Sequence, residues 1–359
     1  MQQWILERLE ISHGDNTPLR AMEGLRGIAV FMVFLVHYST LVEPWISGLS
    51  LTFSHVVHAM GNLGVDLFFV LSGFLIYGTI ISKQSFHALA YTRRRIRRIY
   101  PTFLVVFSVY LLLSVVFPQQ SKLPSGLMDI IQYLVSNLLL LPGIFDIKPM
   151  ITVAWSLSYE LFYYLIIPIV IFACGMKRWS SNTRIMFWLG VSVIGFMLAY
   201  QSAGLVRLLM FVAGILVFEA YHYRQLKIWR GGTLCLVAAL ALFGARIFFT
   251  IDSVTALMVV FVLFLILTLN AFTLGSRTSQ WLCFAPIRWL GNMSYSYYLW
   301  HGLTLKFCFL LLPMIAPATA DSALIYYWLW IPLFVITWLS SFVLYAAIEH
   351  PFSIRRKPK

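Results

Sequence analysis

Long apolar segments separated by short polar stretches run along the whole chain. Most are close to the roughly 20 residues that an α-helix needs to cross a bilayer core. We expect spans at 27–45, 61–81, 100–117, 154–174, 185–200, 205–221, 232–250, 254–274, 292–312 and 323–347. This pattern predicts an all-α polytopic membrane protein with about ten transmembrane helices.

One further apolar segment, residues 127–141, is too short to cross and contains Asp129, Gln132 and Asn137. If it does not cross, both termini are cytoplasmic and 21 of the 26 Lys and Arg residues lie on the cytoplasmic side. If it crossed, twelve of those 21 would face outward. Because basic residues concentrate in cytoplasmic loops, this segment is interpreted as a re-entrant or surface helix on the outer side.

Composition agrees with this assignment, since 60% of the residues are hydrophobic and only 11% are charged, against about 25% in soluble domains. A net charge of +13 would suggest a nucleic-acid partner in a soluble protein. Here basic loops on one side of a membrane account for it, and we expect the lipid bilayer and no nucleic acid as partner. The four cysteines lack ligand-like spacing, which predicts free thiols and no metal site. The expected organisation is a cytoplasmic arm at 1–26, a membrane domain at 27–349 and a basic cytoplasmic tail at 350–359.

Arg26 and His37 stand eleven positions apart in the first span. Eleven residues make close to three helical turns, so both side chains point to one face, roughly 16 Å apart. An arginine at the membrane surface can hold an anion, and a buried neutral histidine can act as a general base. The alternatives are a snorkelling anchor for Arg26 and a packed histidine for His37.

Other spans also carry polar side chains. Asp66 and Ser72 lie in the second span, Ser156 and Glu160 share a face of the fourth, and Tyr298 and His301 follow one stripe of the ninth. An acid or histidine at this depth indicates a cavity or a charged partner. The alternatives are close helix packing for Ser72, capping and an interfacial aromatic belt around Glu160, and simple packing for His301. Glu349, at the end of the last span, is interpreted as an anchor.

Five arginines occur within six positions at the cytoplasmic edge of the third span: Arg93, Arg94, Arg95, Arg97 and Arg98. Guanidinium groups grip phosphates bidentately, so the cluster is suited to a phosphorylated ligand. The alternative is a topology anchor that contacts anionic lipid headgroups.

Taken together, these motifs resemble a known family. The first-span Arg and His, then Phe-Phe-Val-Leu-Ser-Gly-Phe, Arg-Arg-Ile-Arg-Arg-Ile-Tyr-Pro, Trp-Ser-Leu-Ser-Tyr-Glu and Ser-Tyr-Ser-Tyr-Tyr-Leu-Trp-His follow one another in order. This order is similar to that of acyltransferase family 3, the bacterial membrane O-acyltransferases, over residues 20 to 351. The chain is expected to be a stand-alone member, without the extra soluble C-terminal domain that some members carry.

The resemblance implies transfer of an acyl group, most often acetyl, from cytoplasmic acyl-CoA to a hydroxyl of a carbohydrate or surface glycan at the bacterial inner membrane. It implies that Arg26 and His37 are essential, that the arginine cluster meets the cofactor phosphates, and that Ser72 and Glu160 shape the site. Arg26, His37 and Glu160 are therefore the predicted catalytic residues. Asp66, Ser72, Ser156, Tyr298 and His301 are predicted to support the site or bind substrate.

A second hypothesis is a proton-coupled transporter or flippase in which His37, Asp66, Glu160 and His301 relay protons. Such a protein has no need of a phosphate site opposite a midplane histidine. Transporters also often consist of two repeated halves, and the sequence contains no such repeat. The sequence does not identify the acceptor glycan, the acyl chain or the oligomeric state.

Overall fold

The computed structural model of the chain describes residues 8–11, 17–201, 203–318 and 323–354. Within these ranges every long element is a helix and no strand forms, which confirms the all-α prediction. The first half contains α2 (Thr17–Val42), α3 (Gly48–Gly61), α4 (Leu63–Ile81), α5 (Ala88–Val116), α6 (Leu127–Leu138), α7 (Trp155–Ala173) and α8 (Ser181–Gln201). The second half contains α9 (Leu209–Phe218), α10 (Gly232–Ala245), α11 (Ser253–Phe272), α12 (Arg277–Leu282), α13 (Ala285–Asn292), α14 (Ser294–Leu311) and α15 (Ala323–Leu344). Two π-helical segments, Glu219–Tyr223 and Tyr345–Ile354, continue α9 and α15.

Within the described residues, eight helical segments are long and apolar enough to cross a membrane: Pro18–Trp45, Gly48–Ile81, Ala88–Val116, Thr152–Ala173, Ser181–Gln201, Val206–Tyr223, Ser253–Phe272 and Leu324–Ile354. They confirm a multi-pass membrane protein. The other two expected spans, 232–250 and 292–312, are helical as well. However, α10 has 14 residues and α14 carries many polar side chains. Crossing by these two helices remains a prediction.

Helix α6 corresponds to the short segment 127–141. Its 12 residues extend about 18 Å, well short of a bilayer core of about 30 Å. Leu127 and Met128 are largely exposed on it. As predicted, this helix is too short to cross.

Two boundaries differ from the expectation. Residues 46–60 were expected to be an outer loop, but most of them form α3, which runs into α4 with only Asn62 between the two helices. Helix α2 begins at Thr17, ten residues before the predicted span, so Arg26 lies inside the helix and not at its start. The charges of Arg20 and Glu23 lower the hydropathy of this first part without preventing a helix, because both residues are good helix formers.

The N-terminal part of the chain packs on the bundle and does not form a separate arm in its described residues. Leu9 is buried, and its carbonyl accepts a hydrogen bond of 2.7 Å from the Asn292 amide. Glu10 accepts hydrogen bonds from Arg288 and Trp289 of α13. Burial opposes the effect, but these partners lower the pKa of the Glu10 carboxyl below its ordinary value.

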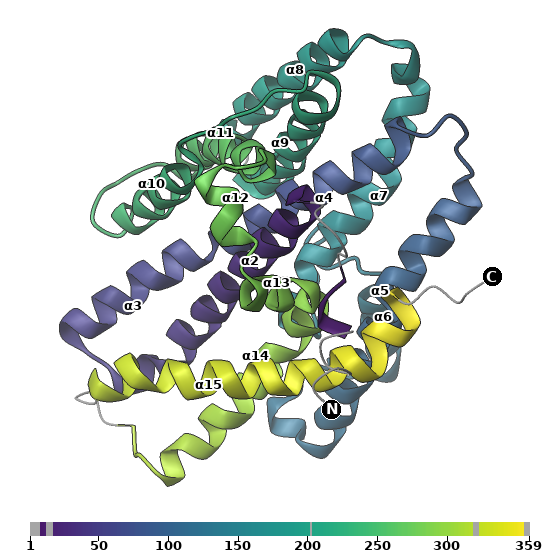
Figure 1. The fold of residues 1–359 in the computed structure, drawn as a ribbon. Coiled ribbons are helices and arrows are strands. Elements are labelled where there is room, and N and C mark those ends of the chain that lie inside the picture. Colours follow the sequence, from purple (N-terminus) through teal and green to yellow (C-terminus); the bar gives the residue numbers. More distant parts are fainter. Residues whose placement is uncertain (1–7, 12–16, 202, 319–322, 355–359) are drawn as a thin grey trace.

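Helix α2 lies at the centre of the bundle, between α3, α4, α13 and α14 (Figure 1). Helices α4 and α9 also pack closely against each other, because Gly73 of α4 has no side chain. A Cβ atom at Gly73 would lie 2.0 Å from the Phe211 carbonyl oxygen. Gly73, in the motif that also contains Ser72, therefore serves helix packing, while Ser72 faces the site described below.

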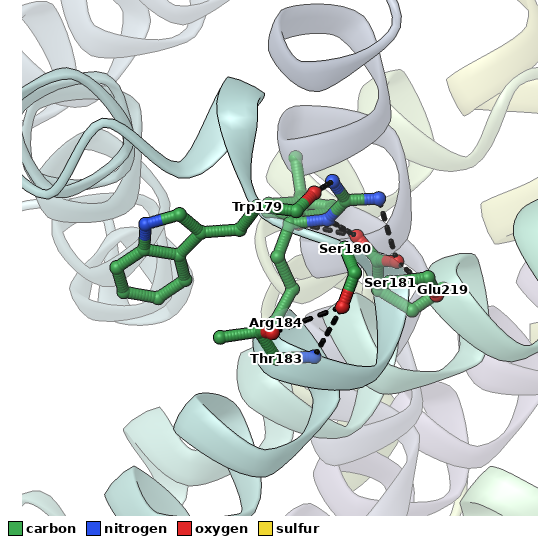
Figure 2. Close-up of polar contacts among 7 residues, drawn as sticks. Trp179, Ser180, Ser181, Thr183, Arg184 and Glu219 are labelled. Carbon is green, nitrogen blue, oxygen red and sulfur yellow. Dashed lines mark hydrogen bonds and ion pairs between the residues drawn. The ribbon is translucent and has the colours of Figure 1, made fainter.

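A buried ion pair joins α8 to the π-helical end of α9. Arg184 Nε lies 2.6 Å from Glu219 Oε1, and Arg184 Nη2 lies 3.1 Å from Oε2 (Figure 2). Ser181 Oγ donates to the same carboxylate at 2.8 Å and Tyr77 OH of α4 at 2.5 Å. Because all of these donors converge on one buried acid, three helices are held in fixed register.

Candidate active site

A cavity of about 190 Å³ lies between α2, α4, α5, α7 and α14. Seven of the sequence-predicted site residues line it: Arg26, Ser72, Arg95, Arg98, Ser156, Glu160 and Tyr298. Apolar side chains such as Phe68, Phe69 and Leu157 fill the rest of the wall. The fold thus unites residues from five helices that are far apart in the sequence.

Arg98 is held in the cavity wall by Glu349. Arg98 Nη1 lies 2.7 Å from Glu349 Oε1, and Glu349 is fully buried. The other carboxylate oxygen accepts hydrogen bonds from the backbone N–H (2.9 Å) and the hydroxyl (2.6 Å) of Ser296. The interpretation of Glu349 as an end anchor was therefore wrong, because this acid orients a cavity arginine. The sequence feature that pointed to a buried partner for Glu349 was an acid at the end of a span, just before a basic tail.

Arg95 and Glu160 both contact Tyr164, which also lines the cavity. The guanidinium of Arg95 lies 4.6 Å from the centroid of the Tyr164 ring, a cation–π contact. Tyr164 OH donates a hydrogen bond to Glu160 Oε1. Tyr164 was not among the predicted site residues, although it lies one helical turn after Glu160.

Arg26 is the third arginine of the cavity. Its charge interacts with those of Arg98, Glu349 and Glu160. Within the described part of the chain, no side chain or backbone group forms a hydrogen bond or ion pair with its guanidinium. Its donors therefore remain available to an anion that enters the cavity.

The remaining arginines of the cluster lie elsewhere. Arg93 and Arg94 are exposed, and Arg97 Nε donates to the Phe352 carbonyl oxygen at 2.8 Å. Consecutive residues on a helix are turned by about 100° from one another, so five arginines in six positions cannot all face one cavity. Arg95 and Arg98, three positions apart, share the inward face.

Hydroxyl groups form the wall of the cavity near the start of α7. Ser156 Oγ and Tyr298 OH lie 2.8 Å apart. Both also contact the Val153 carbonyl oxygen, each at 3.1 Å. This arrangement fixes both hydroxyls at the start of α7, at a polar edge of an otherwise apolar wall.

His37 and His301 contact each other beside the cavity, with ring centroids 5.0 Å apart. His301 Nδ1 lies 2.8 Å from the Tyr297 carbonyl oxygen, which can only accept, so Nδ1 carries the proton of a neutral ring. Nε2 then holds a lone pair, is buried, and has no hydrogen-bond partner among the described residues. The His301 ring also lies 6.3 Å from that of Tyr298, which links the histidine pair to the cavity.

Asp66 is fully buried but does not line the cavity. Asp66 Oδ1 lies 3.7 Å from Arg207 Nε, and the guanidinium lies 6.0 Å from the Trp155 ring. The expectation that this acid has a partner is correct, but the sequence analysis did not identify Arg207. The sequence did contain an indication of this partner, because Arg207 is the one basic residue in the expected span 205–221.

The fold and the cavity thus define a multi-pass helical membrane protein in which three arginines, a carboxylate and paired hydroxyls surround an internal cavity. A family model described as an acyltransferase domain, that of acyltransferase family 3, matches residues 19–348. The chain belongs to this family.

Curated relatives are similar over parts of their length. The peptidoglycan O-acetyltransferase OatA of Listeria monocytogenes is 28% identical over 323 residues, which cover 78% of this chain and 48% of the relative. The O-acetyltransferase OatA of Staphylococcus aureus is 28% identical over 207 residues, 55% of this chain and 30% of the relative. The chain thus spans about half or less of these relatives. No solved structure matches.

Proposed function

We propose that this protein is an O-acetyltransferase of the bacterial cytoplasmic membrane. It transfers an acetyl group from cytoplasmic acetyl-CoA to a hydroxyl of a surface glycan. The observation that carries the proposal is the single cavity that unites Arg26, Arg95 and Arg98 with Glu160 and the Ser156–Tyr298 hydroxyl pair.

The donor enters from the arginine side. The cavity is smaller than the roughly 300–1,000 Å³ typical of pockets that enclose a drug-sized ligand. It therefore suits the slender thioester arm, while the nucleotide of the donor stays outside the cavity. Arg95 and Arg98 are each held by other side chains, so they are pre-organised to contact phosphate groups.

His37 is the base in this proposal and His301 its positioning residue. The lone pair on His301 Nε2 is suited to accept the N–H of His37, which leaves the second nitrogen of His37 free to take a proton. The acceptor hydroxyl loses that proton to His37 as its oxygen attacks the thioester carbonyl. A new C–O bond forms, the C–S bond breaks, and the thiolate leaves and takes up the proton.

Arg26 has two uses in this scheme. Its free guanidinium can stabilise the negative charge that develops on the carbonyl oxygen, a contribution that commonly supplies a factor of about 10²–10³. It can also attract the anionic donor into the cavity. Glu160 and the Ser156–Tyr298 pair offer hydrogen bonds to the sugar.

The relatives support the same reaction class. Two carry names with O-acetyltransferase, and the Listeria protein is named for peptidoglycan. A cell-wall or other surface glycan is therefore the proposed acceptor. Family membership favours an enzyme over the transporter that the buried ionisable groups would also allow.

The test uses purified protein in nanodiscs with radiolabelled acetyl-CoA, and compares the wild type with His37→Ala. We expect release or transfer of label to fall by a factor of about 10²–10⁴, the usual contribution of a general base. His55→Ala is the matched control, since His55 is half-exposed on α3. A folded wild-type protein that neither binds nor turns over acetyl-CoA would refute the proposal.

A further inference from the structure

Three lysines gather at one place on the predicted outer side. Five basic residues lie outside the cytoplasmic set, in a predicted outer loop or in the outer halves of predicted spans: Lys122, Lys148, Arg207, Arg246 and Lys306. Arg207 pairs with Asp66, and Arg246 donates to the Ile251 carbonyl oxygen and to Ser253. Among the residues that the structure describes, the lysines have no such acidic partner, yet the charges of Lys148 and Lys306 both act on Lys122. Basic residues are disfavoured on the outer side, so three together indicate a compensating anion.

Lys122 has a structural role in this group. Its Nζ donates to the carbonyl oxygens of Pro149 (2.9 Å) and Met150 (3.2 Å) and to Thr152 Oγ1 (2.9 Å). Burial and the two neighbouring lysines lower the pKa of its ammonium to about 8. Lys122 thereby pins the loop before α7, and its hydrogen bonds are used within the protein.

Lys148 and Lys306 are different, because both are exposed. Among the described residues, neither ammonium has a hydrogen-bond or ion-pair partner. The acid nearest in sequence to Lys148 is Asp146, which is exposed and likewise forms no ion pair within the described ranges. Two ammonium groups are thus available to a ligand.

The face of α14 that lines the cavity continues along the helix to Lys306. Tyr295, Tyr298, Gly302 and Lys306 occur at i, i+3, i+7 and i+11, so they follow one helix face. Tyr295 and Tyr298 line the cavity. A Cβ atom at Gly302 would meet nothing within 4 Å, so open space borders this face between Tyr298 and Lys306.

The pinned loop reaches the same wall of the cavity. Thr152, which Lys122 holds, precedes Val153. The Val153 carbonyl oxygen accepts the hydrogen bonds of Ser156 and Tyr298 described above. Lys122 is therefore linked through Thr152 and the adjacent Val153 to the hydroxyl pair of the site.

We propose that Lys148 and Lys306 form an outer anion site that holds a phosphate or carboxylate group of the acceptor glycan while its hydroxyl reaches the cavity past Gly302. This inference rests on the proposed function and adds a substrate class to it, an acidic acceptor. The same two ammonium groups could instead bind the phosphate of a lipid headgroup. The acceptor is favoured because the lysines continue the face that lines the cavity.

The test measures binding of fluorescent oligogalacturonate and of a neutral malto-oligosaccharide of equal length to the whole protein in phosphatidylcholine nanodiscs. The wild type should bind the acidic probe more tightly. Lys148→Gln/Lys306→Gln should weaken that binding about tenfold, as two exposed ion pairs of up to about 1 kcal/mol each allow. Arg246→Gln, a basic residue predicted on the same side, is the control and should leave binding unchanged.

Other outcomes overturn the inference. Equal binding of both probes by the wild type, or equal binding of the acidic probe by wild type and double variant, removes the outer anion site. In nanodiscs that also contain phosphatidylglycerol, a double variant that loses bound lipid but keeps the acidic probe identifies a lipid site. Binding of acetyl-CoA by the wild type is measured separately, so failure of the proposed function is distinguished from failure of this inference.

Discussion

Replacing Arg98 with glutamine separates the binding role of this arginine from its structural role. The guanidinium lines the cavity and forms a 2.7 Å ion pair with the buried Glu349. Hydrogen bonds to charged groups contribute about 1.5–3 kcal/mol. If Arg98 contacts a phosphate or the thioester arm, Arg98→Gln should weaken acetyl-CoA binding about 10- to 150-fold.

The same substitution also leaves Glu349 buried without a counter-charge, which typically costs about 3–5 kcal/mol. The single variant should therefore have a lower Tm. The double variant Arg98→Gln/Glu349→Gln removes both charges, and should recover much of the lost Tm without recovering the affinity for acetyl-CoA.

The assay is isothermal titration of acetyl-CoA into protein in nanodiscs, with Tm measured on the same samples. Arg93→Gln is the matched control, because Arg93 belongs to the same cluster but is exposed. Its charge is screened, so a change in Kd of less than about threefold is expected. Equal losses of affinity for Arg93→Gln and Arg98→Gln would refute the assignment of Arg98 to the donor site and leave only a general attraction by the cluster.

Two further predictions concern the scaffold. Arg184→Met leaves the buried Glu219 without its guanidinium partner and should lower the stability by about 3–5 kcal/mol, which is measured as a lower Tm. The control Arg178→Met, at an exposed position, should change Tm little. Similar Tm values for the two variants would contradict the importance of the ion pair. The lowered pKa of Glu10 means that its contacts with α13 stabilise the docked N-terminal segment above the ordinary pKa of 4.5, and this stabilisation is lost as pH falls through the lower folded-state pKa. The protection of residues 8–11 against hydrogen exchange, measured relative to the intrinsic rate at each pH, should therefore fall below about pH 4.5. Glu10→Gln should remove that pH dependence of protection, and an unchanged profile in the variant would assign the effect to another group.

The structure also changes how the histidine pair is understood. From sequence, His37 was a candidate base, Glu160 was a predicted catalytic residue, and Asp66 and His301 were predicted to support the site or bind substrate. The contact of 5.0 Å between the His37 and His301 rings supports His301 as the positioning residue in the proposed scheme. Asp66 pairs with Arg207, and Glu160 accepts from Tyr164.

The sequence by itself determined the class of protein and the family. The length of an apolar segment decides whether it can cross a bilayer, and this property is local. The charge pattern excluded a crossing by 127–141, and α6 is indeed short. The motifs that resemble the family are also local, and the family model covers the same residues. The start of α2 was misplaced because hydropathy measures burial in lipid and not helix formation.

Only the tertiary structure decided which polar residues share a site. Arg98 and Glu349 are 251 positions apart, and nothing in their local sequence relates them. Arg95 faces the cavity and Arg97 does not, because the packing of α5 determines which face points inward. Asp66 was a predicted site residue, but in the structure it pairs with Arg207 and does not line the cavity. Apolar periodicity determines where helices form, but the partner of a buried charge depends on which helices pack together, and that is a property of the folded bundle.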